Sequence, residues 1–325
     1  MVHLINLLAV AALLWTPTAM AQGQGQGQGQ GRWESAARLD VPRAGLAVAV
    51  LDGRLYAAGG AGLTSPRAEF EVFEPELNRW MPATALPRGL ERFGMAAVAG
   101  RIYAAGGYAP GELGVEPTAS MWSWSPEGGI WQSEAAMPGP KADFSMLAYN
   151  DRLYAIGGTR DDNSIYVFDP EGRSWETIEI PDDLTRRGAA IVAFGDHIYV
   201  IGGSLSGELS ARVDIYDLEA DAWTAGPDLP GASTGIAAVA HHGRLHVLGG
   251  TGTDGEQRLT LRRHASWQPG EPGWRTEPDL PTPRTAADAA VLEGGIYLIG
   301  GGSGGGFFAP FTAMDTTDVF LNEAS

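Results

Sequence analysis

The chain has 325 residues, of which 44% are hydrophobic and 19% are charged, and 46 of them are glycine. Its formal net charge of −17 at pH 7 argues against nucleic acid as a partner and against adsorption to an anionic membrane, because both need a basic surface. The sequence has no cysteine, which excludes disulfides, thiolate catalysis and cysteine metal sites.

Residues 1–21 have the pattern of a secretory signal peptide. Residues 4–15 form an apolar core of suitable length, and Ala-Met-Ala at 19–21 is a small-x-small cleavage site. The apolar run is too short to span a bilayer. Residues 22–31 consist of glutamine and glycine, which is typical of a flexible tether. We therefore predict a periplasmic or secreted protein whose folded domain covers residues 32–325.

Six copies of one short pattern fill this predicted domain. Each copy has an aliphatic strand, a polar turn, a second strand with an aromatic residue, and a pair of glycines. The glycine pairs begin at Gly59, Gly106, Gly157, Gly202, Gly249 and Gly300. Tryptophans recur with the same period, at Trp33, Trp80, Trp131, Trp175, Trp223 and Trp274. The period of 44 to 51 residues predicts a repeat architecture.

Within each copy the pattern predicts four antiparallel strands. The first strand, such as residues 47–50, is continuously apolar, which indicates burial on both faces. Turns such as Asp52-Gly53 suit a hairpin, and the glycine pair ends the second strand where the backbone needs room. An alternating third strand, such as residues 165–168, precedes the tryptophan strand. Repeated meanders of this kind predict an all-β fold, a β-propeller.

These motifs resemble the kelch repeat over residues 32–321. The glycine pair, the aromatic residue and the tryptophan occur together in most copies. The fifth copy departs by carrying His246 in place of tyrosine, and it has a long connection over residues 265–273. The resemblance implies a six-bladed β-propeller of four-stranded antiparallel kelch blades.

The sixth copy has no tryptophan after its third strand at residues 318–321, whereas Trp33 precedes the first glycine pair without a copy of its own. We therefore predict that residues 32–34 supply the fourth strand of the last blade. Hydrogen bonds between the N-terminal and C-terminal strands would then close the ring.

Motifs for catalysis and metal binding are weak. Residues 301–305 match the nucleophile-elbow pattern around Ser303, but no helix is predicted after them. His241 and His242 lie together in one turn of the fifth copy, and His197 lies at the matching turn of the fourth. No third metal ligand is evident near the adjacent pair. The acidic pairs in loops lack the spacing of a calcium loop. We predict neither a metal nor another cofactor.

The sharpest candidate site comes from aligning the six copies. Basic residues recur thirteen residues before the aromatic of the second strand, except for one serine. These positions hold Arg43, Lys141, Arg186, Ser233 and Arg284, and we assign Arg92 to the same place in the second copy. They begin the innermost strands, so we predict a cationic ring around one mouth of the central channel. Such a ring suits a carboxylate or another small anion. The alternative is that these cations pair with loop acids or carbonyls as part of the scaffold.

The loops after the glycine pairs share that mouth in kelch propellers. The longer ones cover residues 108–119, 204–212 and 302–316. They carry the aromatic residues Tyr108, Phe307, Phe308 and Phe311. These side chains are suited to stack on a sugar or a peptide, or to cover the channel.

Two functions remain open. The first is a monomeric binding or interaction module for a small anionic ligand, a carbohydrate or a protein partner. Its predicted ligand-binding residues are Arg43, Arg92, Lys141, Arg186, Arg284 and Tyr108. The second is a sugar mutarotase or epimerase similar to the bacterial sialic acid mutarotases, which implies a carboxylate base and an arginine. No acid follows a glycine pair directly here, and Glu208 and Arg212 are the nearest substitutes.

Overall fold

The structure is a computed structural model that describes residues 31–63, 65–112, 114–158, 163–181, 184–255, 257–305 and 308–322. The predicted signal peptide lies outside these residues, as do residues 22–30 of the predicted tether and Phe307. No helix in the described ranges is long and apolar enough to cross a membrane.

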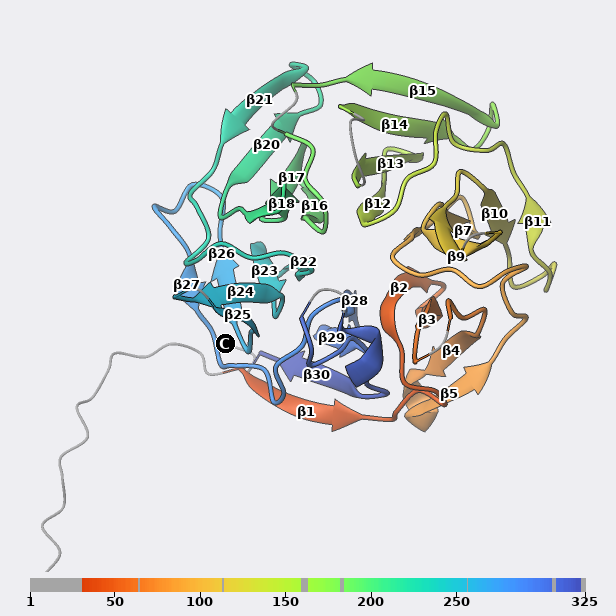
Figure 1. Ribbon diagram of the computed structural model, residues 1–325, viewed down its shortest axis with the longest axis horizontal. Helices are drawn as coiled ribbons and strands as arrows, with labels where there is room; N and C mark the ends of the chain where they lie inside the picture. The colour runs from red at the N-terminus through yellow and green to blue at the C-terminus, as the bar shows by residue number, and fades with distance from the viewer. Residues whose placement is uncertain are drawn as a thin grey trace, which may run out of the picture.

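Six four-stranded antiparallel sheets surround a central axis as the blades of a propeller (Figure 1). The first three blades, from the inner strand outward, are β2 (Ala44–Leu51), β3 (Arg54–Ala61), β4 (Phe70–Glu74) and β5 (Arg79–Pro82); β6 (Gly94–Val98), β7 (Arg101–Ala105), β10 (Met121–Trp124) and β11 (Gln132–Ser133); and β12 (Phe144–Tyr149), β13 (Arg152–Gly157), β14 (Ser164–Asp169) and β15 (Ser174–Glu179). The last three are β16 (Ala190–Phe194), β17 (His197–Ile201), β20 (Val213–Asp217) and β21 (Ala222–Ala225); β22 (Ala237–His241), β23 (Arg244–Leu248), β26 (His264–Trp267) and β27 (Arg275–Thr276); and β28 (Asp288–Leu292), β29 (Gly295–Ile299), β30 (Thr317–Leu321) and β1 (Arg32–Ala36). The predicted six-bladed fold is confirmed.

The last blade is closed by the N-terminal strand, as predicted. β1 pairs antiparallel with β30, and the register places Trp33 opposite Phe320. The indole Nε1 of Trp33 donates to the carbonyl of Pro278, 2.9 Å away, in the chain that leaves the fifth blade. The closing strand is therefore held both by its own blade and by the blade before it.

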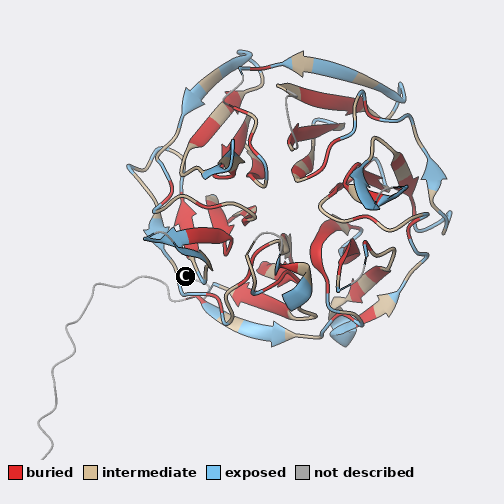
Figure 2. Ribbon diagram, in the orientation of Figure 1, coloured by how far each residue is buried: buried red, intermediate tan, exposed pale blue. Residues whose placement is uncertain are grey.

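Four of the other recurring tryptophans make the same kind of contact with a neighbouring blade. The indoles of Trp80, Trp131, Trp175 and Trp274 each donate to a backbone carbonyl of the preceding blade, at 2.8–3.0 Å. Figure 2 shows that buried residues concentrate in the inner three strands of each blade, whereas the outermost strands are largely exposed. The core thus consists of apolar layers between neighbouring blades, and Trp33 and these four tryptophans each fix the outer edge of one layer.

Three short hairpins follow glycine pairs. Two of them lie where loops are predicted from the sequence, and the third lies where no element is predicted. They are β8 (Tyr108–Gly111) with β9 (Gly114–Pro117), β18 (Ser204–Leu205) with β19 (Glu208–Leu209), and β24 (Thr251–Asp254) with β25 (Gln257–Thr260). In the sixth blade the corresponding segment contains the 3-10 helix η3 (Pro310–Thr312). Isolated bridges tie these segments to the residues that precede the innermost strands, so they surround one mouth of the channel.

Candidate functional site

A closed ring of six backbone hydrogen bonds encircles the channel where the innermost strands begin. Each N–H donates to the carbonyl of an adjacent blade at 2.7–3.0 Å. The residues in order are Gly45, Arg92, Asp143, Gly188, Gly235 and Ala286. All six have a positive φ, between 52° and 66°. Glycine adopts this conformation readily, whereas a residue with a Cβ pays about 1–2 kcal/mol. Arg92, Asp143 and Ala286 are therefore held under strain, which is often found at functional sites.

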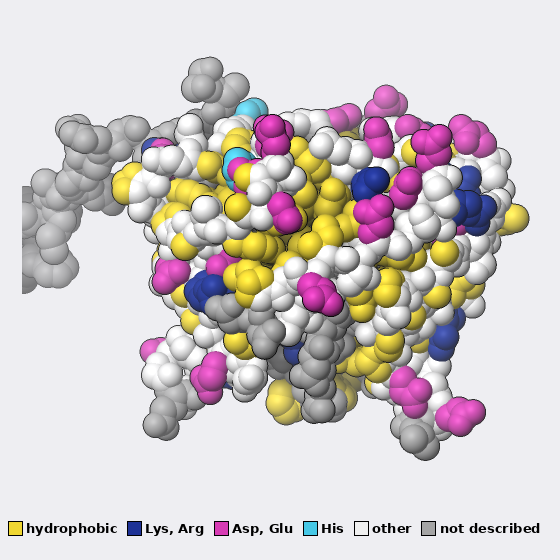
Figure 3. Space-filling model, turned by 90° about the horizontal axis from the view of Figure 1, so that it is seen from above, with side chains coloured by type: hydrophobic (Ala, Val, Ile, Leu, Met, Phe, Trp, Pro, Cys, Tyr) yellow, Lys and Arg dark blue, Asp and Glu magenta, His cyan; other side chains and the backbone are white. Residues whose placement is uncertain are grey.

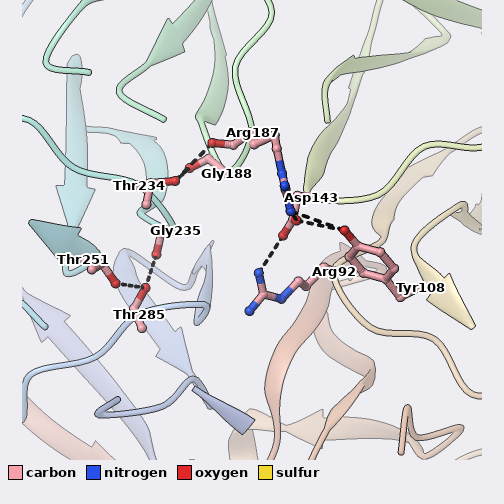
Figure 4. A network of polar contacts seen from close by, with 9 residues as sticks. All are labelled: Arg92, Tyr108, Asp143, Arg187, Gly188, Thr234, Gly235, Thr251 and Thr285. Atoms are coloured by element: carbon pink, nitrogen blue, oxygen red, sulfur yellow. Dashed lines mark hydrogen bonds and ion pairs between the residues drawn. The ribbon is translucent and has the colours of Figure 1, made fainter. Parts of the chain in front are cut away.

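Arg92 and Asp143 belong to a charged cluster, which also contains Arg187 and Tyr108 (Figure 4). Nη1 of Arg92 lies 2.8 Å from Oδ1 of Asp143, and Nη2 of Arg187 lies 2.5 Å from Oδ2. The Tyr108 hydroxyl is 3.4 Å from Oδ2 of Asp143 and accepts from Nη2 of Arg187 at 3.3 Å. Burial by itself would raise the pKa of the Asp143 carboxyl, but the two guanidinium groups hold that pKa below its ordinary value. The Asp143 carboxyl is thus ionised at neutral pH.

Hydroxyl groups occupy the other side of the same mouth (Figure 4). Thr234 donates to the backbone carbonyl of Arg187 at 3.0 Å, and Thr285 donates to that of Gly235 at 3.3 Å. The Thr251 hydroxyl donates to the Thr285 hydroxyl at 3.1 Å. One arc of the mouth is therefore charged, and the opposite arc offers neutral hydrogen-bonding groups.

A central cavity of about 780 Å³ opens at this mouth. Side chains from all six innermost strands line it, and most of them are apolar. The apolar wall includes Val48, Met95, Met146, Ile191 and Ala238. Glu91, Arg92, Tyr108, Asp143 and Arg187 line the charged arc, and Asp288 is the acidic residue on β28. A ligand in this cavity would meet a largely apolar wall and a few placed polar groups, which is the usual character of a small-molecule site.

Three of the predicted site arginines lie inside the blades and away from the cavity. Each is at most 1% exposed and pairs with a carboxylate on the third strand of its own blade. The pairs are Arg43 with Glu71, Arg186 with Asp214, and Arg284 with Asp318. Each arginine also donates to the carbonyl of the first glycine of the pair. These contacts agree with the alternative weighed from the sequence, in which the cations belong to the scaffold.

Lys141 has a similar place in the third blade. Its Nζ donates to the carbonyls of Gly157, at 3.0 Å, and Ser164, at 3.3 Å. The same ammonium lies 4.5 Å from the ring centroid of Tyr166, within the range of a cation–π contact. Like the three arginines, Lys141 is not one of the residues that line the cavity. The expected cationic ring at the mouth is therefore corrected, because these four side chains turn from the axis into their blades.

Arg92 does not occupy the position that the alignment assigned to it. The carbonyls of Lys141 and Arg284 accept the N–H of the second glycine of the preceding pair, and in the second blade the carbonyl of Leu90 does so. Leu90 is thus the equivalent residue, and Arg92 lies two residues further along, on the hydrogen-bonded ring. Of the predicted site residues, Arg92 and Tyr108 are the two that line the cavity.

The sequence interpretation missed Arg187, Asp143 and Asp288. The sequence does show two adjacent arginines at 186 and 187. The repeat spacing pointed to Arg186, which is buried, and passed over Arg187, which lines the cavity. The alternative pair, Glu208 and Arg212, does not line the cavity among the described residues. Arg212 instead lies 2.8 Å from Oδ1 of Asp214.

Comparison with known proteins shows which repeat family the chain belongs to. The chain matches the Kelch motif over residues 42–87, 91–138, 140–179 and 185–230, which is more than half of its length. The chain belongs to the kelch family. Mouse Kelch-like protein 35 is 26% identical over 236 residues, covering 71% of this chain and 38% of that protein. Alpha-scruin of Limulus polyphemus is 28% identical over 196 residues, covering 56% of this chain and 21% of that protein.

The kelch chain therefore spans well under half the length of these curated relatives. A solved structure of YjhT matches it with a TM-score of 0.77 and 17% sequence identity, covering 87% of this chain and 95% of YjhT. At that identity the likeness is one of fold.

Proposed function

We propose that this kelch propeller is a binding module that holds a carboxylate-bearing ligand in the mouth of its central cavity. The exposure and the contacts of Arg187 carry the proposal. Its side chain is 48% exposed, lines the cavity, and makes its described side-chain hydrogen bonds from Nη2 alone. A guanidinium has five N–H donors in a planar fork that matches a carboxylate. Donors of Arg187 therefore remain for a ligand.

The neighbours of Arg187 favour binding by fixing its orientation. Asp143 holds Arg187 and Arg92 by charge-assisted bonds, so less side-chain freedom is lost when a ligand arrives. Tyr108 and the threonine hydroxyls across the mouth add donors and acceptors for the rest of the ligand. The cavity volume of about 780 Å³ is within the range of small-molecule sites.

A protein partner is the second candidate, and an apolar crown around the mouth favours it. Seven large hydrophobic side chains are exposed among the described residues, and five of them lie in the segments that follow glycine pairs. These five, which form the crown, are Leu63, Val115, Leu205, Phe308 and Phe311. Exposed apolar patches of this kind mark protein interaction sites. A partner docked on the crown would supply its carboxylate from an aspartate, a glutamate or a C-terminus.

Calorimetric titration with succinate, glucuronate and a short acidic peptide tests the proposal. Binding to Arg187→Gln should be at least about tenfold weaker than to the native protein, because one charge-assisted hydrogen bond contributes about 1.5–3 kcal/mol. Arg152→Gln is the matched control, since this exposed arginine pairs with Glu176 away from the cavity. Equal binding by native protein and Arg187→Gln, or no binding of any probe, would reject the proposal.

A crown variant separates the two kinds of ligand. Phe311 is 51% exposed on η3 at the rim of the cavity. Phe311→Ser should weaken the peptide and leave succinate unchanged if the natural ligand is a protein segment. If the ligand is a small molecule, the variant should bind peptide and succinate as the native protein does.

A further inference from the structure

We infer that the cavity selects ligands that carry an ammonium group as well as a carboxylate, with Asp288 as the partner of the ammonium group. This inference rests on the proposed function, because it assigns the carboxylate end of the ligand to Arg187. The ligand class is thus a zwitterion, such as an amino acid or a protein segment that carries both an ammonium group and a carboxylate.

Asp288 is held rigidly in the cavity wall at the start of β28. Its Oδ2 accepts the backbone N–H of Val48 from the first blade, at 2.7 Å, and its Oδ1 accepts the N–H of Ala289, at 2.8 Å. An ionised carboxylate has about four lone-pair sites, so two hydrogen bonds leave acceptor capacity for a ligand. The carboxylate is therefore oriented before a ligand arrives.

Asp288 is also a cavity carboxylate that has no cationic partner among the residues that the structure describes. Asp143 is neutralised by two arginines, and Glu91 lies beside the charge of Arg92. For Asp288, burial raises the pKa to about 6, two backbone N–H groups oppose the rise, and no cationic side chain of the described residues contributes. A buried carboxylate without a cationic partner is costly, and a ligand ammonium group would reduce that cost.

The repeat itself does not require an acid at this position. Asp288 lies two residues after the ring residue Ala286. The equivalent residues of the other five blades are Ala47, Gly94, Ser145, Ala190 and Ala237. Ser145 is the other polar one, and its hydroxyl donates to the backbone carbonyl of Ala189 at 3.0 Å. Five blades thus hold their inner strands without a carboxylate here, so a role for Asp288 beyond the scaffold is favoured.

The two ends of such a ligand would meet opposite charges on opposite sides of the cavity. Asp143 and its flanking arginines centre on the third blade, and the sixth blade, which carries Asp288, lies across the ring from it (Figure 1). Asp288 also lies deeper in the cavity than the ring of hydrogen bonds at the mouth, because it is two residues further along the chain than the ring residue Ala286. A zwitterion would therefore lie obliquely, with its carboxylate at the mouth and its ammonium group on the far wall.

Matched pairs of probes test this inference by calorimetry at pH 8: 4-aminobutyrate against butyrate, and 6-aminohexanoate against hexanoate. For the length that fits, the amino acid should bind the native protein about tenfold or more tighter than the plain carboxylate. Asp288→Asn should abolish this preference while plain carboxylates bind at least as tightly as before, and Asp288→Ala, which copies the residue of three other blades, should do the same. Glu91→Gln is the control and should keep the preference.

The outcomes separate this inference from the proposed function. If amino and plain carboxylates bind the native protein equally, the inference is wrong and the carboxylate site stands. If no carboxylate binds but hexylamine binds and Asp288→Asn abolishes its binding, the Arg187 site fails and the Asp288 site stands. If neither hexylamine nor any carboxylate binds, both are wrong.

Discussion

Arg186 and Arg187 are neighbours in sequence with different environments. Arg186 is 1% exposed and pairs with Asp214 inside the fourth blade, whereas Arg187 is 48% exposed and pairs with Asp143 at the cavity. Successive residues of an extended chain point to opposite sides, so one step separates a scaffold position from a ligand position. The scaffold position repeats as a cation in four blades. The position after it varies, as Ala44, Glu91, Ala142, Arg187, Thr234 and Thr285.

The buried ion pairs predict a specific pattern of stability changes. Arg284→Met should lower the free energy of unfolding by about 3–5 kcal/mol, because Asp318 is left as an uncompensated buried charge. The double variant Arg284→Met/Asp318→Leu should recover most of that loss, since it removes both charges. Urea unfolding measures both variants. A loss of less than about 1 kcal/mol in the single variant would contradict a scaffold role for this pair.

Repeat alignment finds what recurs, and the binding residues do not recur. Arg43, Lys141, Arg186 and Arg284 could be located because four blades share a cation that donates to the carbonyl of the first glycine of the pair. Asp143 and Asp288 occupy positions where the other blades have mostly glycine or alanine, so no period points to them. Their importance depends on distances across the cavity, which the sequence does not contain.

Where the fifth and sixth blades meet, a buried histidine pair replaces the usual apolar contact. Nδ1 of His246 lies 2.9 Å from Nε2 of His264, and both residues are 1% exposed. The rings of Trp33 and Phe320, from the two strands that close the propeller, lie 5.5 Å and 4.5 Å from the His264 ring. Burial lowers the pKa of His246 to about 3 and that of His264 to about 4. Both side chains are thus neutral in the folded protein at neutral pH.

This pair should make the closing seam sensitive to acid. The unfolded histidines have a pKa near 6.5, so between about pH 6.5 and pH 3 the unfolded state binds more protons than the folded state. The stability that the neutral pair contributes at pH 7 is therefore lost as the pH falls through that window. Urea unfolding between pH 7.5 and pH 4 should show a steeper loss for the native protein than for His246→Phe/His264→Val. Parallel curves for the two proteins would rule out this role.

Most strands could be predicted from the sequence, but the hairpins at the mouth could not. The blade strands repeat six times, so each copy supports the reading of the others. β8–β9 and β18–β19 have strands of four and two residues, which are too short to show a period of two. They were expected as loops, and the structure corrects this to paired strands.

The whole ring depends on the pairing of its two ends. β1 contributes five paired residues to β30, and Trp33 links them to the fifth blade. Deleting residues 32–36 should sharply lower the melting temperature, because it exposes the edge of β30 and removes the Trp33 contacts. Adding a synthetic peptide of residues 31–38 should restore part of the loss, which a simple folding defect would not allow. An unchanged melting curve after the deletion would exclude closure by this strand.

The charge of the whole molecule contrasts with that of the mouth. The net charge is −17, and acidic side chains outnumber basic ones on the face shown in Figure 3. An anionic ligand is therefore repelled at long range, and Arg92 and Arg187 attract it at the mouth. Added salt screens charges beyond about 10 Å at 0.1 M, so it should weaken the repulsion more than the local contact.

A crystal structure of the protein soaked with succinate tests the carboxylate site most directly. We expect one succinate carboxylate inside the cavity mouth, within hydrogen-bonding distance of the Arg187 guanidinium, while Asp143 keeps its contacts with both arginines. Succinate bound only on the outer surface, with the cavity mouth free of it at a saturating concentration, would contradict the proposed binding site.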